Sequence, residues 1–276
     1  MKKRIHLVRT TLCASLLALS CAVQATPVSP AIGNLVSSDQ IAVDYLNQNY
    51  QEQVNGTVPD RESGNIPGIS LYESGLRRAG FYYEFGVRYV SGSNTYLGKT
   101  QGGTPMTTDT GNTIVDTRGR FGWAFATALR GAVAPYLTVG SYDWKRGLGG
   151  QIPYNEHYSH YFLGAGLLGL YAPSPRLLVY ARGSLGRVIY PQMTVSGLSS
   201  YGVPDTTFSL GSASRYSVGI GADFLITQSF RIHAGVDETQ FSYGVSSVVA
   251  IPGGAIQEPA STTRQIACEI GADVAF

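Results

Sequence analysis

Apolar and polar residues alternate along much of this chain, most clearly in its last stretch, residues 266–276 (IACEIGADVAF). Every second residue counted back from the terminal aromatic is apolar: Phe276, Val274, Ala272, Ile270, Cys268 and Ile266. The residues between them are small or charged. Because successive side chains of a β-strand point to opposite faces, this pattern predicts a strand with one face against hydrocarbon and the other in a polar interior.

Similar alternating segments recur along the sequence and predict ten strands. They are placed near residues 39–52, 66–77, 81–97, 112–126, 133–146, 158–171, 177–190, 214–227, 230–243 and 262–276. The gaps between them are alternately short and long, as in barrels with short periplasmic turns and long extracellular loops. With both ends in the periplasm, the strand number must be even. The predicted fold class is therefore all-β, a closed antiparallel transmembrane β-barrel of ten strands.

The first two predicted strands are the weakest part of this prediction. Residues 45–52 are very polar, and the segment 66–77 contains Pro67 and Glu73. An eight-stranded barrel preceded by a separate N-terminal segment is therefore the alternative.

Charged residues fall on one face of the predicted strands, opposite the large apolar side chains. In the segment 81–90, Glu84 and Arg88 share a face that excludes Phe81 and Phe85. An arginine on the lipid face near mid-bilayer costs about 2–4 kcal/mol, a penalty that would enforce this segregation. The same parity assigns these side chains to the interior: Asp44, Glu84, Arg88, Asp116, Arg118, Arg120, Arg182, Arg215, Asp223, Arg231, His233, Asp237, Glu269 and Asp273.

This interior set contains six arginines and seven carboxylates besides its histidine. Buried charges persist when they are paired and hydrogen-bonded, and the guanidinium fork suits carboxylates. Small barrels fill their interior with side chains, whereas water-filled channels belong to barrels of about 16–18 strands. The set is therefore interpreted as a structural plug, with a solute-selective lining as the alternative.

Aromatic residues gather where the predicted strands would meet the two membrane interfaces. Those expected at the periplasmic interface are Phe81, Trp123, Phe125, Tyr171, Phe230 and Phe276. Those expected at the outer interface are Tyr89, Trp144, Tyr158 and Tyr161. Tryptophan and tyrosine favour that zone because the ring can lie among acyl chains while its polar edge stays hydrated.

The N-terminus predicts export. Four basic residues within the first nine precede an apolar core from Leu12 to Val23, and small residues near Ala25 suit cleavage of a signal peptide. The predicted organisation is a signal peptide over residues 1–25, a periplasmic lead-in over 26–38 and the barrel over 39–276.

Removal of this leader changes the chemistry of the chain. Four of the 20 basic residues leave with it, so the rest has 16 basic against 18 acidic groups, a net charge of −2. Nucleic-acid binding is therefore not expected. Only Cys268 remains, so no intramolecular disulfide is possible. No later stretch approaches the about 20 apolar residues of a membrane helix.

The stretch from Gly164 to Gly169 matches the GxGxxG fingerprint of dinucleotide sites. Such a site needs a helix directly after the motif, and the next segment, Leu170 to Pro175, contains two prolines. The motif is therefore interpreted as glycine on one face of a barrel strand. The scattered histidines also lack metal-ligand spacing. No cofactor or metal site is expected.

His157 and Ser159 lie two residues apart on one predicted strand boundary, with Glu156 beside them. This arrangement resembles part of the site of outer-membrane lipid A deacylases, which carry a His-x-Ser pair near the outer leaflet. The asparagine that those enzymes carry after the serine is His160 here, and no matching glutamate follows about a strand later. The pair is therefore interpreted as polar residues at a loop–strand junction.

Ten strands are also typical of the omptin outer-membrane proteases, which use acidic and histidine residues on facing extracellular loops. No histidine occurs in the long loops predicted at residues 53–65, 91–111, 191–213 and 244–261. No catalytic residues are therefore expected.

Two segments, TGNTIVDTRGRFGWAF (110–125) and YSHYFLGAGLLGLYAPSP (158–175), resemble small Gram-negative outer-membrane β-barrel proteins, many of unassigned function. With the leader and the terminal phenylalanine, the resemblance covers the whole architecture. It implies a monomer in the outer membrane, in contact with outer-membrane lipid and lipopolysaccharide. It also implies insertion by the barrel-assembly machinery, which would recognise the final strand through Ile266, Cys268, Ile270, Val274 and Phe276.

The expected function is that of a non-enzymatic outer-membrane barrel whose exposed loops serve in surface structure, adhesion or ligand contact. A narrow porin-like channel for small solutes is the alternative. A lipid or peptide hydrolase is the third possibility, and it requires a constellation of base and nucleophile or acid at the rim. The sequence assigns no external ligand.

Overall fold

The computed structural model describes most of the chain, and the positions of its strands follow from the alternation of side chains. The described residues are 28, 30–77, 80–99, 104–128, 130–149, 153–202, 204–251 and 254–275. The predicted signal peptide and the terminal Phe276 lie outside them.

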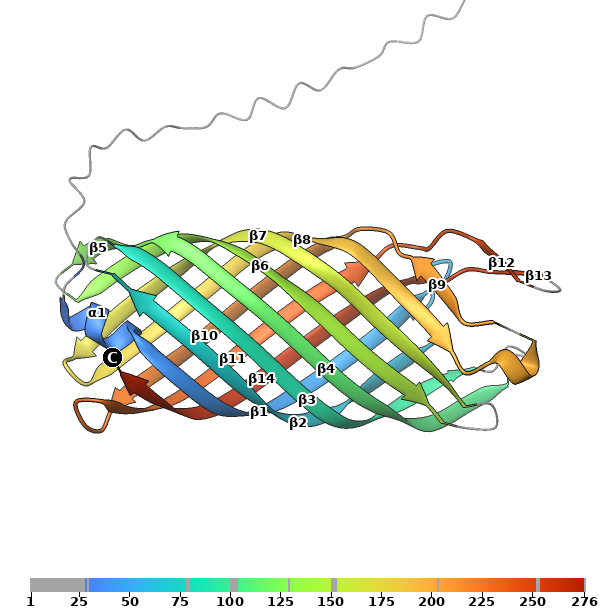
Figure 1. Cartoon of the computed structure of the whole chain (residues 1–276), viewed down its shortest axis with the longest axis horizontal. Helices are drawn as coiled ribbons and strands as arrows, with labels where there is room; N and C mark the ends of the chain where they lie inside the picture. The colour runs from blue at the N-terminus through green and yellow to red at the C-terminus, as the bar shows by residue number, and fades with distance from the viewer. Residues whose placement is uncertain are drawn as a thin grey trace, which may run out of the picture.

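Ten long antiparallel strands form a closed ring (Figure 1). They are β1 (Ser38–Gln53), β2 (Arg61–Leu76), β3 (Phe81–Lys99), β4 (Pro105–Trp123), β6 (Gly131–Leu148), β7 (Tyr154–Ser174), β8 (Leu177–Ser196), β10 (Ser214–Leu225), β11 (Phe230–Tyr243) and β14 (Ala260–Ala275). The first strand pairs with both β2 and β14, so that Val43 lies opposite Ile69 on one side and Ile270 on the other. This closure confirms the ten-stranded barrel and excludes the eight-stranded alternative.

Short helices and strands lie at the two ends of the ring. They are α1 (Pro30–Val36), β5 (Phe125–Ala128), η1 (Ser199–Tyr201), β9 (Thr206–Ser209), β12 (Val249–Ile251) and β13 (Gly254–Ile256). We call the end with the connections 77–80, 124–130, 175–176 and 226–229 the short-turn end, and the opposite end the long-loop end. In Figure 1, α1 lies at the short-turn end and the β12–β13 hairpin at the long-loop end.

Several strands are longer than predicted, mainly toward the long-loop end. The second strand begins at Arg61 rather than at residue 66, and β8 continues to Ser196 rather than to residue 190. These extensions are polar on their outer face, so their backbones pair in the sheet without the apolar alternation that marks a membrane strand. In the other direction, the predicted strand 112–126 is interrupted at Ala124, between β4 and β5.

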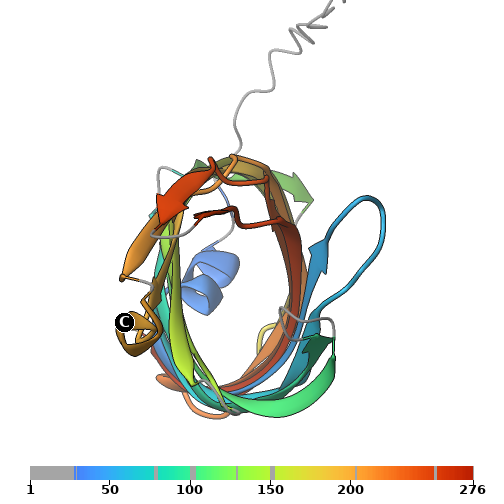
Figure 2. The same cartoon turned by 90° about the vertical axis from the view of Figure 1, so that its right-hand side faces the viewer.

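The predicted lead-in contains an unanticipated helix, α1, which lies inside the barrel at the short-turn end (Figure 2). Its Ile32, Leu35 and Val36 are at most 7% exposed. Their contacts form part of the lower cluster, a group of buried apolar residues that also includes Leu76, Tyr82, Ala124, Ala132, Ala134, Tyr136, Leu168, Leu170, Ala172 and Leu178. The lower cluster closes this end of the lumen.

Two side chains from the barrel wall hold the end of this helix. The guanidinium of Arg231 donates hydrogen bonds to the carbonyl oxygens of Leu35 and Ser37, and Ser74 Oγ donates to Val36 O at 2.6 Å. The last carbonyl groups of a helix have no partner within it, and a cation beside them is favourable. Arg231 therefore fixes α1 in place.

The outer wall changes from apolar to polar along each long strand. On β1, Ile41, Val43 and Tyr45 are more than half exposed, whereas the next outward positions are Asn47, Asn49 and Gln51. Other exposed apolar side chains on the outer wall of the long strands include Leu71, Phe85, Val87, Leu137, Val139, Leu163, Leu167, Ile220, Ile232 and Ile270. We call this ring the apolar belt. A membrane strand needs about 9–11 residues, so strands of 16 or more residues continue beyond the belt.

The predicted outward direction of the interface aromatics is found for four of the six near the short turns, while Phe125 is partly exposed and Phe276 lies outside the described residues; at the other end the prediction is partly wrong. Phe81, Trp123, Tyr171 and Phe230 are exposed on the outer wall near the short turns, as are Tyr89 and Tyr161 farther along. The prediction is wrong for Trp144 and Tyr158, which are 0% exposed. Both side chains point into the lumen. Their strands, β6 and β7, continue beyond the apolar belt, and the alternation of side chains places Trp144 and Tyr158 on the inward face of these extensions.

None of the helices in the described part of the chain is long and apolar enough to cross a membrane.

We expect the folded barrel to resist SDS until it is heated. A closed sheet pairs its backbone groups without an open edge, so local opening is difficult. Electrophoresis of unheated, refolded protein should give a faster band than a boiled sample. Equal mobility of the two samples after verified refolding would contradict a closed barrel.

Candidate functional site

The fourteen charged residues assigned to the interior by parity all lie on the lumen side of the barrel wall. Twelve are buried, and Arg118 and Arg182 are partly buried. They come from β1, β3, β4, β8, β10, β11 and β14, so the ion pairs among them join strands that are distant in the sequence. They form a central network across the lumen and a smaller group next to α1.

The central network is built around Arg88 on β3. Its Nε lies 2.8 Å from Asp44 Oδ1 on β1, and its Nη2 lies 2.9 Å from Glu269 Oε2 on β14. The same Nη2 donates a hydrogen bond to Tyr72 Oη at 3.2 Å, and Ser70 Oγ donates to Asp44. One buried guanidinium on β3 therefore binds two carboxylates that are direct register partners on the adjacent strands β1 and β14.

A second part of the network centres on Glu84. Arg120 pairs with this carboxylate from the neighbouring strand, and Arg182 reaches it across the lumen at 3.8 Å. Arg182 also donates from Nε to Asp237 Oδ1 at 2.9 Å. Arg118 takes a different partner, since it donates to Tyr72 Oη with its guanidinium carbon 5.0 Å from the ring centroid.

The third part of the network lies farther toward the long-loop end. Arg215 lies 3.4 Å from Asp116 across the lumen, and its guanidinium carbon lies 3.7 Å from the ring centroid of Phe162. Every charged residue of the central network thus has a carboxylate, a guanidinium or an aromatic ring beside it.

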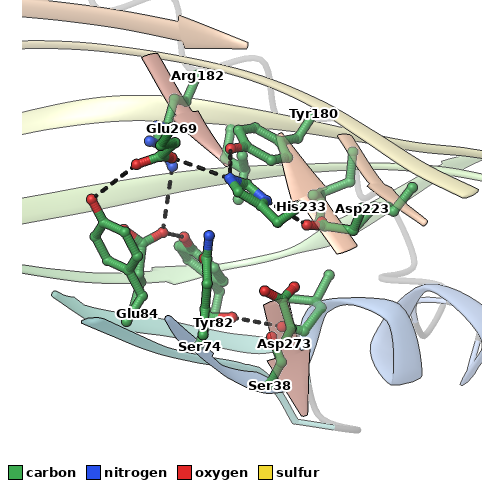
Figure 3. Close-up of a pocket in the computed structure, with 16 residues that line it drawn as sticks. Ser38, Ser74, Tyr82, Glu84, Tyr180, Arg182, Asp223, His233, Glu269 and Asp273 are labelled. Atoms are coloured by element: carbon green, nitrogen blue, oxygen red, sulfur yellow. Dashed lines mark hydrogen bonds and ion pairs between the residues drawn. The ribbon is translucent and has the colours of Figure 1, made fainter. Parts of the chain in front are cut away.

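A cavity of about 60 Å³ separates this network from α1. Figure 3 shows His233 on its wall, between Asp223 and Glu269. One imidazole nitrogen lies 2.6 Å from Asp223 Oδ1 and the other 3.1 Å from Glu269 Oε1. Asp273, 2% exposed, lines the same cavity.

The donors of Asp223, His233 and Asp273 come within 4.8 Å of one another, close enough to surround a metal ion. However, both nitrogens of His233 are already engaged with carboxylates, whereas a histidine ligand offers a free lone pair to the metal. The geometry therefore fits an imidazole paired with two carboxylates better than a metal centre.

A further buried group of charges lies in the long-loop half of the lumen, and the sequence analysis missed it. Its centre is Arg146 on β6, whose side chain is 1% exposed. The guanidinium forms ion pairs with Glu156 at 2.7 Å, with Glu62 at 3.3 Å and with Glu52 at 4.0 Å. Three carboxylates from three different strands therefore converge on one cation.

Aromatic rings surround the same guanidinium. Its central carbon lies 4.9 Å from the ring centroid of Tyr50, 5.4 Å from Trp144, 5.8 Å from Tyr96 and 5.9 Å from Tyr158. A cation within about 6 Å of a ring face is attracted by the ring quadrupole. We call this group the Arg146 cage, and it consists of Arg146, Tyr50, Tyr96, Trp144, Tyr158, Glu52, Glu62 and Glu156.

The alternation of side chains along β6 and β7 indicates that the residues of this cage point into the lumen. Tyr142, Trp144 and Arg146 alternate on one face of β6, and Glu156 and Tyr158 do the same on β7. The predicted strands end at residue 146 and begin again at residue 158, which places Glu156 in a loop, while Trp144 and Tyr158 are expected at the outer interface and Arg146 receives no assignment. Continuing the alternation a few residues further would have turned them into the lumen.

Glu258, in the loop between β13 and β14, approaches the cage from the long-loop end. Its Oε1 accepts a hydrogen bond from Tyr158 Oη at 3.0 Å, and its backbone N–H donates to Ser246 Oγ at 2.8 Å. Burial, followed by the negative charges of Glu156 and Glu52, raises the pKa of Glu258 well above its usual range. Its carboxyl therefore keeps a proton to higher pH than an exposed glutamate does.

An apolar group that we call the upper cluster packs around the cage. Its buried members are Leu46, Tyr50, Ile66, Val90, Ile114, Tyr142, Trp144, Tyr158, Val188, Met193, Phe208, Leu210, Phe241, Tyr243 and Ala267. Val249 and Ile256 of the β12–β13 hairpin pack against it. The lumen is thus occupied at three levels, by the lower cluster, the central network, and the upper cluster with its cage.

The His-x-Ser pair lies on the outer wall instead. His157 Nε2 is 2.5 Å from Asp143 Oδ2 on the neighbouring strand, and both side chains are about 40% exposed. Ser159 lies directly opposite Asp143 in the strand register. Glu156, the acid considered from the sequence, points inward to Arg146. The acid beside the histidine is therefore Asp143, which sequence proximity did not indicate.

The residues expected to form the insertion signal lie on the last strand, β14. Cys268, Ile270 and Val274 are exposed on the outer wall, and Ile266 is partly exposed on the same face. The terminal Phe276 lies outside the described residues. Their role in insertion stays a prediction.

No protein-family model and no curated protein matches the chain. Its fold is similar to that of the outer membrane protease OmpT from Escherichia coli, with a TM-score of 0.62 and 9% sequence identity over 87% of this chain and 97% of that chain. The solved structures also include the P. putida toluene transporter TodX, with a TM-score of 0.38 and 10% identity over 91% and 93% of the two chains. Ail, the attachment invasion locus protein of Yersinia pestis, has a TM-score of 0.38 and 11% identity over 87% and 99%.

The fold is therefore that of the Gram-negative outer-membrane β-barrels. At 9% identity, the likeness to OmpT shows the fold alone.

Proposed function

We propose that this protein is a non-enzymatic outer-membrane barrel whose long-loop end projects from the cell and serves as a contact surface for surface structure, adhesion or ligand binding. The observation that supports this proposal is the filling of the lumen at three levels. A solute path needs a continuous wet passage, whereas here paired charges lie between two apolar clusters. The narrow channel remains the competing function, and conductance separates the two.

The proposed location follows from the apolar belt and the leader. The chain would be exported, lose residues 1–25, and be inserted by the barrel-assembly machinery with its short turns in the periplasm. As a monomer it would contact outer-membrane lipid and lipopolysaccharide around the belt. The polar half of the strands would stand above the membrane, where it is available to an external partner.

Cysteine labelling on intact cells tests this orientation. In a Cys268→Ser background, a membrane-impermeant maleimide should label Val58→Cys, in the exposed 54–60 loop, on whole cells. Gln228→Cys, in an exposed short turn, should react only after the outer membrane is opened. The reverse pattern would contradict the proposed orientation.

A second candidate function, a lipid hydrolase, is favoured by the Asp143–His157 pair on the outer wall. An acid, a histidine and a serine together can transfer an acyl group if the imidazole reaches the hydroxyl. Ser159 lies on the same face two residues from the histidine. The substrate would be an acyl ester of an outer-leaflet lipid.

The hydrolase hypothesis predicts that purified barrel releases fatty acid from vesicles containing lipopolysaccharide and phospholipid. Ser159→Ala should abolish the release without changing heat-modified mobility. If wild type releases no fatty acid, or if Ser159→Ala releases as much as wild type, the non-enzymatic function stands.

A further inference from the structure

A groove of about 700 Å³ crosses the outer wall of the barrel over β2, β3, β4 and β6. Its apolar lining comes from side chains that are exposed on this wall: Leu71, Phe85, Val87, Phe121 and Val139. Burial of such surfaces against hydrocarbon is favourable. The groove therefore offers an apolar chain more contact than a flat wall does.

A glycine at an outward position of β4 helps to form this groove. Gly119 is the register partner of Phe85 on β3 and of Val139 on β6, which both point outward. A Cβ added at Gly119 would lie 3.2 Å from the ring of Phe121, so a large side chain would project among these residues. The absence of a side chain leaves room for an acyl chain.

The groove runs from the short-turn edge of the apolar belt toward its middle. One row of register partners follows it across the sheet: Asp39, Glu73, Phe85, Gly119 and Val139. Asp39 is the second residue of β1, whereas Val139 is the ninth residue of β6, and both strands begin at the short-turn end. Because barrel strands are tilted, this row climbs from the interface into the hydrocarbon layer.

Two carboxylates lie at the short-turn edge of the groove. Asp39 and Glu73 line it, are exposed, and lie directly opposite each other on β1 and β2. Like charges in this position are unfavourable, and neither carboxylate has an ion-pair partner within the described part of the chain. This edge therefore attracts a cation from the surrounding headgroups.

An exposed cation follows on the other side of Tyr83. The Arg77 guanidinium carbon lies 5.7 Å from the ring centroid of Tyr83, whose hydroxyl donates a hydrogen bond to Glu73 Oε1 at 3.3 Å. Neighbouring negative and positive groups complement a zwitterion. The carboxylates suit an ammonium, which is a compact N–H donor, and the guanidinium suits a phosphate.

We propose that this groove binds one phospholipid whose headgroup carries a primary ammonium, a phosphatidylethanolamine, with an acyl chain over Gly119. The ammonium donates hydrogen bonds to Asp39 and Glu73, and the phosphate lies beside Arg77. A trimethylammonium has no N–H to donate, and the carboxylates repel an anionic headgroup. The inference goes beyond the proposed function and rests on it only for the leaflet, which is the periplasmic one when the short turns face the periplasm.

Native mass spectrometry of the intact, refolded protein in detergent tests the proposal. The protein is offered an equimolar mixture of phosphatidylethanolamine, phosphatidylcholine and phosphatidylglycerol with identical acyl chains, so that only the headgroup differs. We expect one retained lipid per barrel, with phosphatidylethanolamine enriched several-fold over each of the other two.

The carboxylates are tested by the double variant Asp39→Asn, Glu73→Gln, which should retain phosphatidylethanolamine and phosphatidylcholine about equally. Glu238→Gln is the matched control, because this outer-wall carboxylate pairs with Arg264, and it should keep the preference of wild type. Heat-modified mobility verifies that each variant is folded. If the double variant does not fold, Asp39→Asn alone replaces it and should lower the preference.

The groove itself is tested by Gly119→Leu, which fills the space for the acyl chain and should reduce retention of all three lipids several-fold. Gly183→Leu makes the same change at an outward position of β8 that does not line the groove, where an added Cβ would have no neighbour closer than 3.9 Å. It should retain lipid as wild type does.

Four results would overturn the proposal: no retained lipid, equal retention of the three lipids by wild type, an unchanged preference in the folded carboxylate variant, or unchanged retention by Gly119→Leu. The first two would mean that the groove is covered by bulk lipid only. None of these results bears on the filling of the lumen, so the proposed function would survive them. A conducting wild-type barrel would refute that function and leave the lipid measurements unaffected.

Discussion

Replacing Arg88 with alanine is expected to lower the free energy of unfolding by about 3–5 kcal/mol, because the change leaves two buried carboxylates without their cation. Asp44 and Glu269, its partners at 2.8 and 2.9 Å, have side chains that are at most 2% exposed. The effect should appear as a lower temperature of heat modification and a lower urea midpoint in lipid vesicles.

Arg264→Ala is the matched control for this prediction. Arg264 also pairs with a carboxylate, Glu238, at 2.8 Å, but it lies on the outer wall with a side chain that is 53% exposed. Exposed pairs contribute little to stability, so this variant should unfold nearly as wild type does. Equal losses in Arg88→Ala and Arg264→Ala would show that burial of the central network does not govern stability.

Val43→Arg should destabilise the inserted barrel by about 2–4 kcal/mol, since it places a charge on the lipid face in the apolar belt. Val43 is 63% exposed and lies between Ile41 and Tyr45 on the outer wall of β1. Reversible urea unfolding in phospholipid vesicles measures the difference from wild type directly.

The control for this second prediction lies on the same strand. Asn47, two outward positions further along, is exposed and hydrogen-bonded only to Asn65 among the described side chains. An added arginine near or beyond the interface costs about 0–1 kcal/mol, so Asn47→Arg should remain close to wild type. If both variants lose the same stability, the apolar belt does not mark the depth of the membrane.

The ten-strand closed barrel could be predicted from the sequence because two independent constraints agree. The period of two places Glu84 and Arg88 opposite Phe81 and Phe85, and lipid penalises any exchange between these faces. The alternation of short and long gaps, with both ends in the periplasm, then requires an even number of strands, which the ten alternating segments satisfy. The structure confirms the barrel, including the polar first pair that favoured the eight-strand alternative.

The pairing within the lumen could not be predicted, because parity gives the direction of a side chain and not its partner. Arg182 reaches Asp237 from a different strand of the ring, and Arg118 takes the Tyr72 hydroxyl rather than a carboxylate. These choices depend on the stagger of the strands and on the tilt that brings residues of different registers to one level.

The helix α1 and the Arg146 cage were not predicted from the sequence, each for its own physical reason. The helix α1 is short and contains Gly33, so its stability depends on the lower cluster and on Arg231 rather than on its own sequence. The Arg146 cage was missed because Trp144 and Tyr158 fit an interface equally well by composition. Only the length of β6 and β7 beyond the apolar belt separates the two interpretations.

Planar-bilayer recording of the purified, refolded wild type tests the central claim that the lumen is filled. The account predicts no stepwise conductance from protein whose insertion is verified by heat-modified mobility, because paired charges and two apolar clusters occupy the passage. Stable, ion-selective openings from wild type would contradict it and would favour the narrow channel.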